Sequence, residues 1–263
     1  MTTATEERTN ALEERAKEAR RLVVDMAASE RGCHLGGSLS AMDLLIAALD
    51  GTRDEESKVV LSKGHAAAGL YAALHAMGIL EEDPAPRYGL LGHPYTGHPG
   101  PKVPGVSFPT GSLGHGLPYA AGWALAQRLK GTGGRAVAIV GDGELQEGLI
   151  WETVQVAAAR ALGNLVILVD RNGGQNDGLV GDISPLPHLA ERFAAFGCDT
   201  AEVDGHDLAA LTRTLAAHDS PRPLAVVANT VKGKGVRAVE GKAASHYVVI
   251  DKARAEKWKK GIR

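Results

Sequence analysis

Two runs made only of aliphatic residues constrain the fold of this chain most strongly. AVAIV at 136–140 and LVILV at 165–169 each have the length of a buried strand, and apolar residues at helical spacing lie between them. Continuous apolar runs are typical of strands that are covered on both faces. The pattern therefore predicts a βαβ unit whose two strands lie parallel and adjacent.

The rest of the sequence continues this alternation of strands and helices. We expect further strands at 58–62 and within 200–207 and 223–235. Helices are predicted at these ranges: 6–29, 65–80, 117–130, 144–161, 207–218 and 251–263, the last one basic. Such alternation favours an α/β fold with a mostly parallel sheet and helices on both faces, which we expect to form one domain over 1–263.

Two further stretches are less regular. SLSAMDLLIAAL predicts a helix near 38–49, with Ser40 as its N-cap and Asp43 at its third helical position. A stretch rich in glycine and proline follows at 81–116. Loops of that length inside a compact domain are usually functional or disordered, so this one is a candidate for a place in the site.

Composition excludes several classes of partner. The net charge of −2 with both signs interspersed gives no electrostatic case for nucleic acid or for an acidic membrane surface. The amino terminus alternates acidic and basic residues, so we expect neither a signal peptide nor a transmembrane span. Cys33 and Cys198 are isolated thiols, which fits a reducing cytoplasm better than a disulfide scaffold.

Polar residues follow both aliphatic runs, where the predicted strands end. Asp142 follows the first strand and Asn172 the second, and parallel strands bring their carboxyl ends to one edge of a sheet. A carboxylate and an amide oxygen, with a backbone carbonyl, phosphate and water, suit Mg²⁺ or Ca²⁺. Gly141 and Gly143 let the backbone approach an anion, and a following helix would add its positive end. An isolated GDG is more often only a tight turn, so the pairing with Asn172 carries this prediction.

The order GDG, helix, apolar strand, Asn resembles the thiamine diphosphate signature, in which Asp, Asn and a carbonyl two residues further on hold the metal. Here that carbonyl would belong to Gly174. Over residues 14–250, seven motifs occur in the same order as in the diphosphate-binding part of transketolases: HLGGSLSAMDLL, VLSKGHAAAGLYAAL, GVSFPTGSLGHGL, GDGELQEGLIWE, LVDRNGGQNDG, EVDGHD and NTVKGKGV. The chain looks most like the smaller, N-terminal subunit of split transketolases. The resemblance implies a thiamine diphosphate-binding fold and, as cofactors, thiamine diphosphate with Mg²⁺ or Ca²⁺.

The resemblance also implies roles for several histidines. His65 and His246 match residues that bind the diphosphate, and His34 and His98 match residues that line the substrate channel. GHP occurs twice, so His93 is the reserve candidate for the position given to His98. Imidazoles can donate to phosphate oxygens and move protons near neutral pH, so we count these four as catalytic. Surface or core roles are expected for His75, His188, His206 and His218.

Cofactor contacts are implied for two further segments. Leu113 would pack against the thiazolium ring, with Gly111 and Ser112 shaping the wall beside it. Glu144 follows the GDG turn and counts, with the two glycines of that turn, among the cofactor-binding positions.

Acidic residues and three departures from the family complete the list of candidates. Glu147 and Glu152 match acids that lie toward the subunit interface and link paired active sites, and Glu147 counts as catalytic. Asp170 stands where the family often keeps an acid beside the metal loop. Leu35 replaces a common proline, His115 a common glutamine, and the second GHP is unusual, which together indicate a specialised substrate without identifying it.

The resemblance implies that this chain carries only half of an active site. The acid that activates the cofactor's pyrimidine and the arginines that bind sugar phosphates belong to domains for which the residues after 230 leave no room. A second subunit would carry the pyrimidine-binding and C-terminal domains, and two copies of each chain would form a dimer of heterodimers. The expected reaction moves a two-carbon ketol unit from a ketose, free or phosphorylated, to an aldehyde acceptor.

Three alternatives remain open at this point. One keeps the cofactor but passes the two-carbon unit to a lipoyl or other carrier acceptor, or decarboxylates a 2-oxo acid within a biosynthetic pathway. Another treats the chain as a non-enzymatic partner with a decayed pocket, against which the intact Asp142, Asn172, His65 and His246 argue. A plain nucleotide-binding domain is weaker still, because no GxGxxG follows the first predicted strand.

Overall fold

Five parallel strands form the central sheet in a computed structural model that describes residues 3–262. The strands are β1 (Lys58–Leu61), β2 (Ala136–Gly141), β3 (Leu165–Arg171), β6 (Asp199–Asp204) and β7 (Leu224–Asn229). Their order across the sheet is β1-β2-β3-β7-β6, and every neighbouring pair is parallel. The predicted fold class is confirmed, and the two aliphatic runs are indeed adjacent strands.

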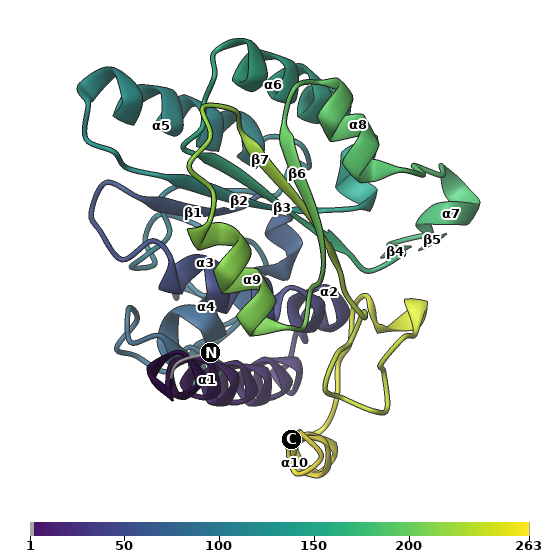
Figure 1. The fold of residues 1–263 in the computed structure, drawn as a ribbon. Helices are drawn as coiled ribbons and strands as arrows, with labels where there is room; N and C mark the ends of the chain where they lie inside the picture. The colour runs from purple at the N-terminus through teal and green to yellow at the C-terminus, as the bar shows by residue number, and fades with distance from the viewer. Residues whose placement is uncertain (1–2, 263) are drawn as a thin grey trace.

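Helices cover both faces of this sheet (Figure 1). One layer holds α1 (Thr3–Ala27), α3 (Met42–Asp50), α4 (Ala67–Ala76) and α9 (Leu208–Ala216), and the other holds α5 (Gly116–Lys130), α6 (Gly148–Ala159) and α8 (Leu189–Ala195). Successive strand residues point to opposite faces, so Val137 and Ile139 pack into the first layer while Ala138 and Val140 pack into the second. Burial on both faces explains why β2 is apolar at every position.

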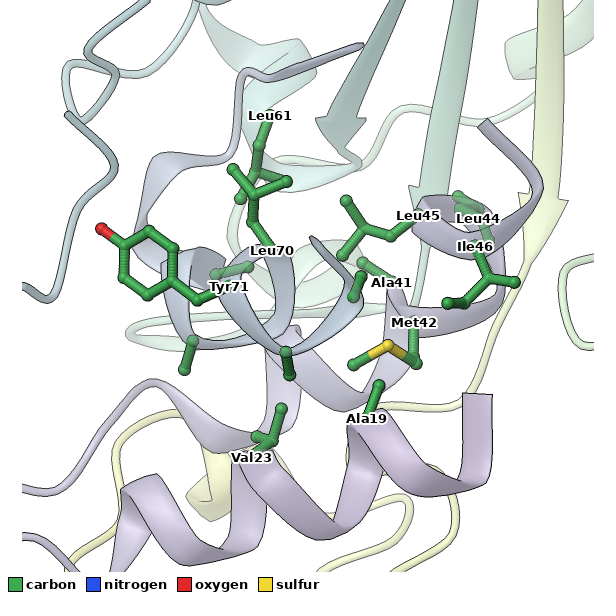
Figure 2. Close-up of a cluster of buried hydrophobic side chains, with 14 of the residues drawn as sticks. Ala19, Val23, Ala41, Met42, Leu44, Leu45, Ile46, Leu61, Leu70 and Tyr71 are labelled. Atoms are coloured by element: carbon green, nitrogen blue, oxygen red, sulfur yellow. The ribbon is translucent and has the colours of Figure 1, made fainter. Parts of the chain in front are cut away.

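The core of the first layer forms where α1, α3 and α4 meet beneath the sheet. Figure 2 shows Ala19 and Val23 of α1 facing Met42 of α3, with Leu70 and Tyr71 of α4 beside them. All five of these side chains are at most 3% exposed. Small residues at the contact let the helices approach closely, which matches the alanine-rich sequence of α4.

Short elements connect these layers. They are α2 (Leu35–Ser40), η1 (Gly64–Ala66), η2 (Ala85–Arg87), η3 (Gly143–Gln146), β4 (Gly174–Gln175), β5 (Gly178–Leu179), α7 (Val180–Ile183), η4 (Ala243–Ser245) and α10 (Lys252–Lys259). The predicted terminal helices at 6–29 and 251–263 correspond to α1 and α10, although Arg263 lies outside the described residues. The chain from residue 81 to 116 is irregular apart from η2 and the first residue of α5. No helix within residues 3–262 is long and apolar enough to cross a membrane.

Two local predictions were wrong. Ser40 is not an N-cap: it ends α2, and its hydroxyl donates to the Asp170 carboxylate over 2.7 Å. The expected helix 144–161 is broken at Glu147, because the first turn after Asp142 is the 3-10 segment η3 and α6 begins only at Gly148. The helix end expected to favour an anion beside the GDG turn is therefore absent from that position among the described residues.

Candidate functional site

Four neighbouring strands end at the same edge of the sheet, and each is followed by a polar residue. Lys63 lies beyond β1, Asp142 beyond β2, Asn172 beyond β3 and Lys232 beyond β7. All four line one cavity of about 410 Å³. The parallel sheet thus brings two cations, a carboxylate and an amide to one place from distant parts of the sequence.

Most of the residues predicted for the site meet in this cavity. Twelve of them line it: His34, His65, Gly111, Leu113, Gly141, Asp142, Gly143, Glu144, Glu147, Asn172, Gly174 and His246. Two predicted residues, Ser112 and His98, lie outside that lining. The His98 ring is nevertheless 6.1 Å from the His34 ring, whereas within residues 3–262 His93 makes no ring contact with this group.

Asp142 and Asn172 are held side by side by backbone hydrogen bonds. The Asp142 carboxylate accepts from the Gly143 N–H over 2.9 Å and from the Gly173 N–H over 2.6 Å. The Asn172 side-chain oxygen accepts from the Gly174 N–H over 3.0 Å. Burial, followed by the nearby negative charge of Asp170, raises the pKa of Asp142 to about 6. A buried acid with a raised pKa is one that a bound cation would stabilise in its ionised form.

Asp170 organises the floor of the site from the end of β3. Its carboxylate is fully buried and accepts from the Lys63 ammonium and from the hydroxyls of Ser40 and Thr230. The side-chain amide of Asn172 donates to it over 3.1 Å. Burial alone would raise the pKa of Asp170, but Lys63 and the hydroxyl donors outweigh burial and lower it. The acid is therefore an ionised anchor that fixes which end of the Asn172 amide faces the cavity.

Two lysines in the cavity were missed by the sequence analysis. Lys63 is 1% exposed and Lys232 is 4% exposed, which is rare for lysine. Burial, followed by the repulsion of Lys63, lowers the pKa of Lys232 to about 8. Both lie in motifs already quoted, SKGH and VKGKG, directly after buried strands. That position was the available signal. The other lining residues not predicted are Gly37, Gln146, Gln175, Asn176 and Asp177.

Imidazole rings form a wall beside these lysines. His34 lies at the centre, with ring distances of 5.5 Å to His65 and 5.1 Å to His246. Burial, followed by neighbouring positive charges, lowers the pKa of His65 to about 2 and those of His34 and His246 to about 4. The His34 Nδ1 atom is buried and has no hydrogen-bond partner among the described residues. All three rings are neutral at pH 7 and retain hydrogen-bonding capacity for a ligand.

Glu144 supports the cavity wall through three hydrogen bonds. Its carboxylate accepts from the Ser62 hydroxyl over 2.5 Å, from the Gly114 N–H over 2.9 Å and from the Gly141 N–H over 3.0 Å. These bonds tie the loop that carries Leu113 to the ends of β1 and β2. Both carboxylate oxygens are thus engaged within the chain.

The remaining candidates lie at the rim or beside it. Glu147 precedes α6, lines the cavity and is exposed, and Glu152 is exposed on the same helix. His115 is exposed, with Nδ1 3.1 Å from the Leu113 carbonyl oxygen. Leu35, in place of the expected proline, begins α2 and is fully buried.

The donor set fits an anion and a divalent cation rather than a metal alone. No group of three or more His, Cys, Asp or Glu side chains within residues 3–262 could hold a metal. Asp142, Asn172 and the Gly174 carbonyl instead offer a partial oxygen set, which ligand phosphates would complete. The lysines and neutral imidazoles supply the donors that a phosphorylated ligand requires.

These features define an α/β domain that binds a phosphorylated cofactor at its strand ends, and comparison with known families identifies it further. The family model described as "Transketolase, thiamine diphosphate binding domain" matches residues 12–262. The chain belongs to this family. The predicted class of enzyme, a transketolase-type transferase, is confirmed.

Several relatives match this chain over nearly their whole length. One of the two kinds of chain that make up the apulose-4-phosphate transketolase of Actinobacillus succinogenes is 37% identical over 250 residues, covering 90% of this chain and 91% of that protein. The 6-deoxy-6-sulfo-D-fructose transketolase subunit SqwG of a Clostridium species is 34% identical over 266 residues, covering 95% and 94%. The predicted resemblance to one subunit of split transketolases is confirmed.

Solved transketolases share the fold but are longer. The Campylobacter jejuni enzyme superimposes with a TM-score of 0.84 at 28% identity, over 95% of this chain and 43% of that one. A Pichia stipitis transketolase in complex with sedoheptulose 7-phosphate gives 0.85 at 27%, over 95% and 40%. The chain therefore spans about two-fifths of these transketolases.

Proposed function

We propose that this chain is the diphosphate-binding subunit of a transketolase that moves a two-carbon ketol unit from a ketose to an aldehyde acceptor. The observation that carries the proposal is the convergence of Lys63, Asp142, Asn172 and Lys232 on one cavity at four adjacent strand ends. Membership of the transketolase family supplies the reaction class, and relatives of similar length are named as transketolase subunits.

The diphosphate would be held by the positive side of the cavity. Lys63 and Lys232 provide ammonium groups, and His65 and His246 provide ring N–H donors beside them. The lowered pKa values of Lys232 and of both histidines support this role, because they arise from burial and mutual repulsion that an anion would relieve. Leu113 and Gly111 would form the apolar wall, with Ser112 beside them, and Glu144 would keep that wall in place.

A magnesium ion would be held by the acidic side. The side-chain oxygens of Asp142 and Asn172 and the backbone carbonyl of Gly174 are the proposed ligands. Gly141 and Gly143 flank the acid, and a side chain at 143 would come within 2.8 Å of the Gln175 amide oxygen. Ca²⁺ has the same preference for oxygen and could replace Mg²⁺.

Thiamine diphosphate, when bound, supplies the carbon nucleophile that the reaction requires. The protein's own contribution is to orient the substrate and to move protons between sugar hydroxyls and imidazole nitrogens. His34 is suited to this because its Nδ1 atom has no partner among the described residues, and the His98 ring lies beside it. Neutral imidazoles can accept a proton and return it near pH 7. Glu147 is the proposed link from the rim of the cavity toward a second active site.

A second subunit would complete the site. It would carry the pyrimidine-binding and C-terminal domains, with the activating glutamate and the phosphate-binding arginines, and two pairs would form a dimer of heterodimers. The whole chain would then act as one diphosphate-binding domain. The unpaired buried cysteines Cys33 and Cys198 support a cytoplasmic location. Transfer to a lipoyl carrier or decarboxylation of a 2-oxo acid is not favoured, because the relatives compared above are named transketolases.

The test is a ketol-transfer assay with the chain alone, the partner alone and the two mixed, each with thiamine diphosphate and Mg²⁺. A ketose donor and a set of aldehyde acceptors would be supplied and the chain-extended product measured. We expect activity only in the mixture, loss of it in Asp142→Ala, and no change in Glu202→Gln, an exposed residue of β6. Full activity of the lone chain would contradict the half-site, and no transfer by the mixture to any acceptor would contradict the proposed function.

A further inference from the structure

We propose that His206 is a positioning residue for Lys232, acting through the backbone N–H of Val231. This inference rests on the proposed function, because it gives Lys232 the task of binding the diphosphate. His206 lies outside the cavity, in the turn after β6, and was expected to have only a surface or core role.

His206 belongs to a buried cluster of three side chains from three elements. Arg20 comes from α1, Asp43 from α3 and His206 from the β6–α9 turn, and their side chains are 8%, 5% and 10% exposed. The Asp43 carboxylate accepts from Arg20 Nη2 over 2.5 Å and lies 2.7 Å from His206 Nδ1. Burial raises the pKa of Asp43, but Arg20 and His206 outweigh it and hold that pKa below its usual value. Asp43 is therefore an ionised acceptor.

The second ring nitrogen of His206 determines what this cluster does. Val231 N–H donates to His206 Nε2 over 2.9 Å. An imidazole nitrogen that accepts a hydrogen bond carries no proton, so the proton of the neutral ring lies on Nδ1 and is donated to Asp43. A carboxylate that selects the tautomer of a histidine in this way also fixes the ring orientation. The cluster thus presents a fixed acceptor to one backbone amide.

That amide belongs to the residue before Lys232, in a segment fastened on both sides. The Thr230 hydroxyl donates to Asp170, and the Gly233 N–H donates to the Gly36 carbonyl over 3.0 Å. Between these anchors, the Lys232 ammonium reaches to 3.4 Å from His246 Nδ1 and 3.5 Å from the Gln175 carbonyl. The bond from Val231 to His206 is the anchor nearest to Lys232 on its amino-terminal side.

The cluster touches the same segment a second time. Gly235 has φ +88°, and a Cβ there would lie 3.0 Å from Cδ of Arg20. Arg20 therefore packs directly against the turn that follows Lys232. Contacts on both sides of Lys232 distinguish this arrangement from a general role in packing α1 against α3, which would need no bond to Val231.

Two substitutions separate the functions of the two ring nitrogens. His206→Asn keeps a donor at the position of Nδ1 but has no acceptor at the position of Nε2, whereas His206→Gln places an amide oxygen where it can accept from Val231. The measurement is thiamine diphosphate affinity at saturating Mg²⁺, made on the complex of this chain with its partner. We expect the dissociation constant to rise at least tenfold in His206→Asn, about 1.4 kcal/mol, and to stay within about threefold of wild type in His206→Gln.

A double-mutant cycle with Lys232→Met distinguishes positioning from loss of structure. Lys232→Met alone should weaken binding, and adding His206→Asn to it should weaken binding no further. If His206→Asn costs as much without Lys232 as with it, or leaves wild-type affinity unchanged, the positioning role is wrong. If Lys232→Met itself has no effect, the failure is that of the proposed diphosphate site. Should His206→Asn not fold, Asp43→Asn tests the same path, with the same dependence on Lys232 expected and an effect independent of Lys232 contradicting it.

Discussion

Replacing Asp170 with asparagine tests the account of the site floor most severely. The carboxylate is 0% exposed, pairs with Lys63, which is 1% exposed, and accepts from the Ser40 and Thr230 hydroxyls. Asp170→Asn leaves the Lys63 charge buried without an anion and turns an NH₂ group toward existing donors. Breaking a buried pair by removing one partner costs about 3–5 kcal/mol of unfolding free energy. We expect a loss in that range.

The assay is urea unfolding followed by circular dichroism, in the absence of cofactor. Asp170→Asn combined with Lys63→Met removes both charges and should recover most of the lost stability, because no isolated charge then remains buried. The matched control is Glu202→Gln, which breaks a pair with Arg171 whose side chains are 50% and 44% exposed. That change should cost less than about 1 kcal/mol. A cost for Asp170→Asn as small as that of the control would refute the reasoning.

Three further outcomes are expected. Because burial holds the pKa of His34 at about 4, below its unfolded value, its contribution to stability is present above about pH 6.5 and lost as the pH falls toward 4; His34→Gln should flatten urea midpoints measured between pH 7 and 4.5, and an unchanged slope would count against it. Glu144→Gln should cost about 1–3 kcal/mol in thermal unfolding, since its amide NH₂ would face an N–H donor; no change in melting temperature would contradict this. Gly64→Ala would place a Cβ 2.6 Å from the Thr110 carbonyl carbon and should destabilise by about 1–3 kcal/mol, whereas wild-type stability would show that the turn can yield.

The parts of the fold that sequence predicted well are those decided by local pattern. AVAIV and LVILV could be recognised as neighbouring strands because both are apolar at every position, and this in turn placed Asp142 beside Asn172. A parallel sheet needs no further information to bring these two residues to one edge.

The errors arose where a distant partner overrode a local preference. Serine is a favoured N-cap, but the Ser40 hydroxyl bonds to Asp170, a residue on another element that no local rule connects with it. Lysine is ordinarily exposed, so Lys63 and Lys232 attracted no attention until the sheet placed them against Asp170 and His246. His206 was missed for the same reason, since Asp43 is far away in sequence and Val231 lies beyond the next strand.

The central claim is that the strand-end cavity holds a divalent cation between Asp142 and Asn172 and, with it, the diphosphate of thiamine diphosphate. The direct measurement is calorimetric affinity for thiamine diphosphate with and without Mg²⁺, for the wild-type complex and for Asp142→Asn. Wild type should bind much more tightly with Mg²⁺, and the variant should remain folded yet lose that dependence. Equal enhancement by Mg²⁺ in both proteins would contradict the claim.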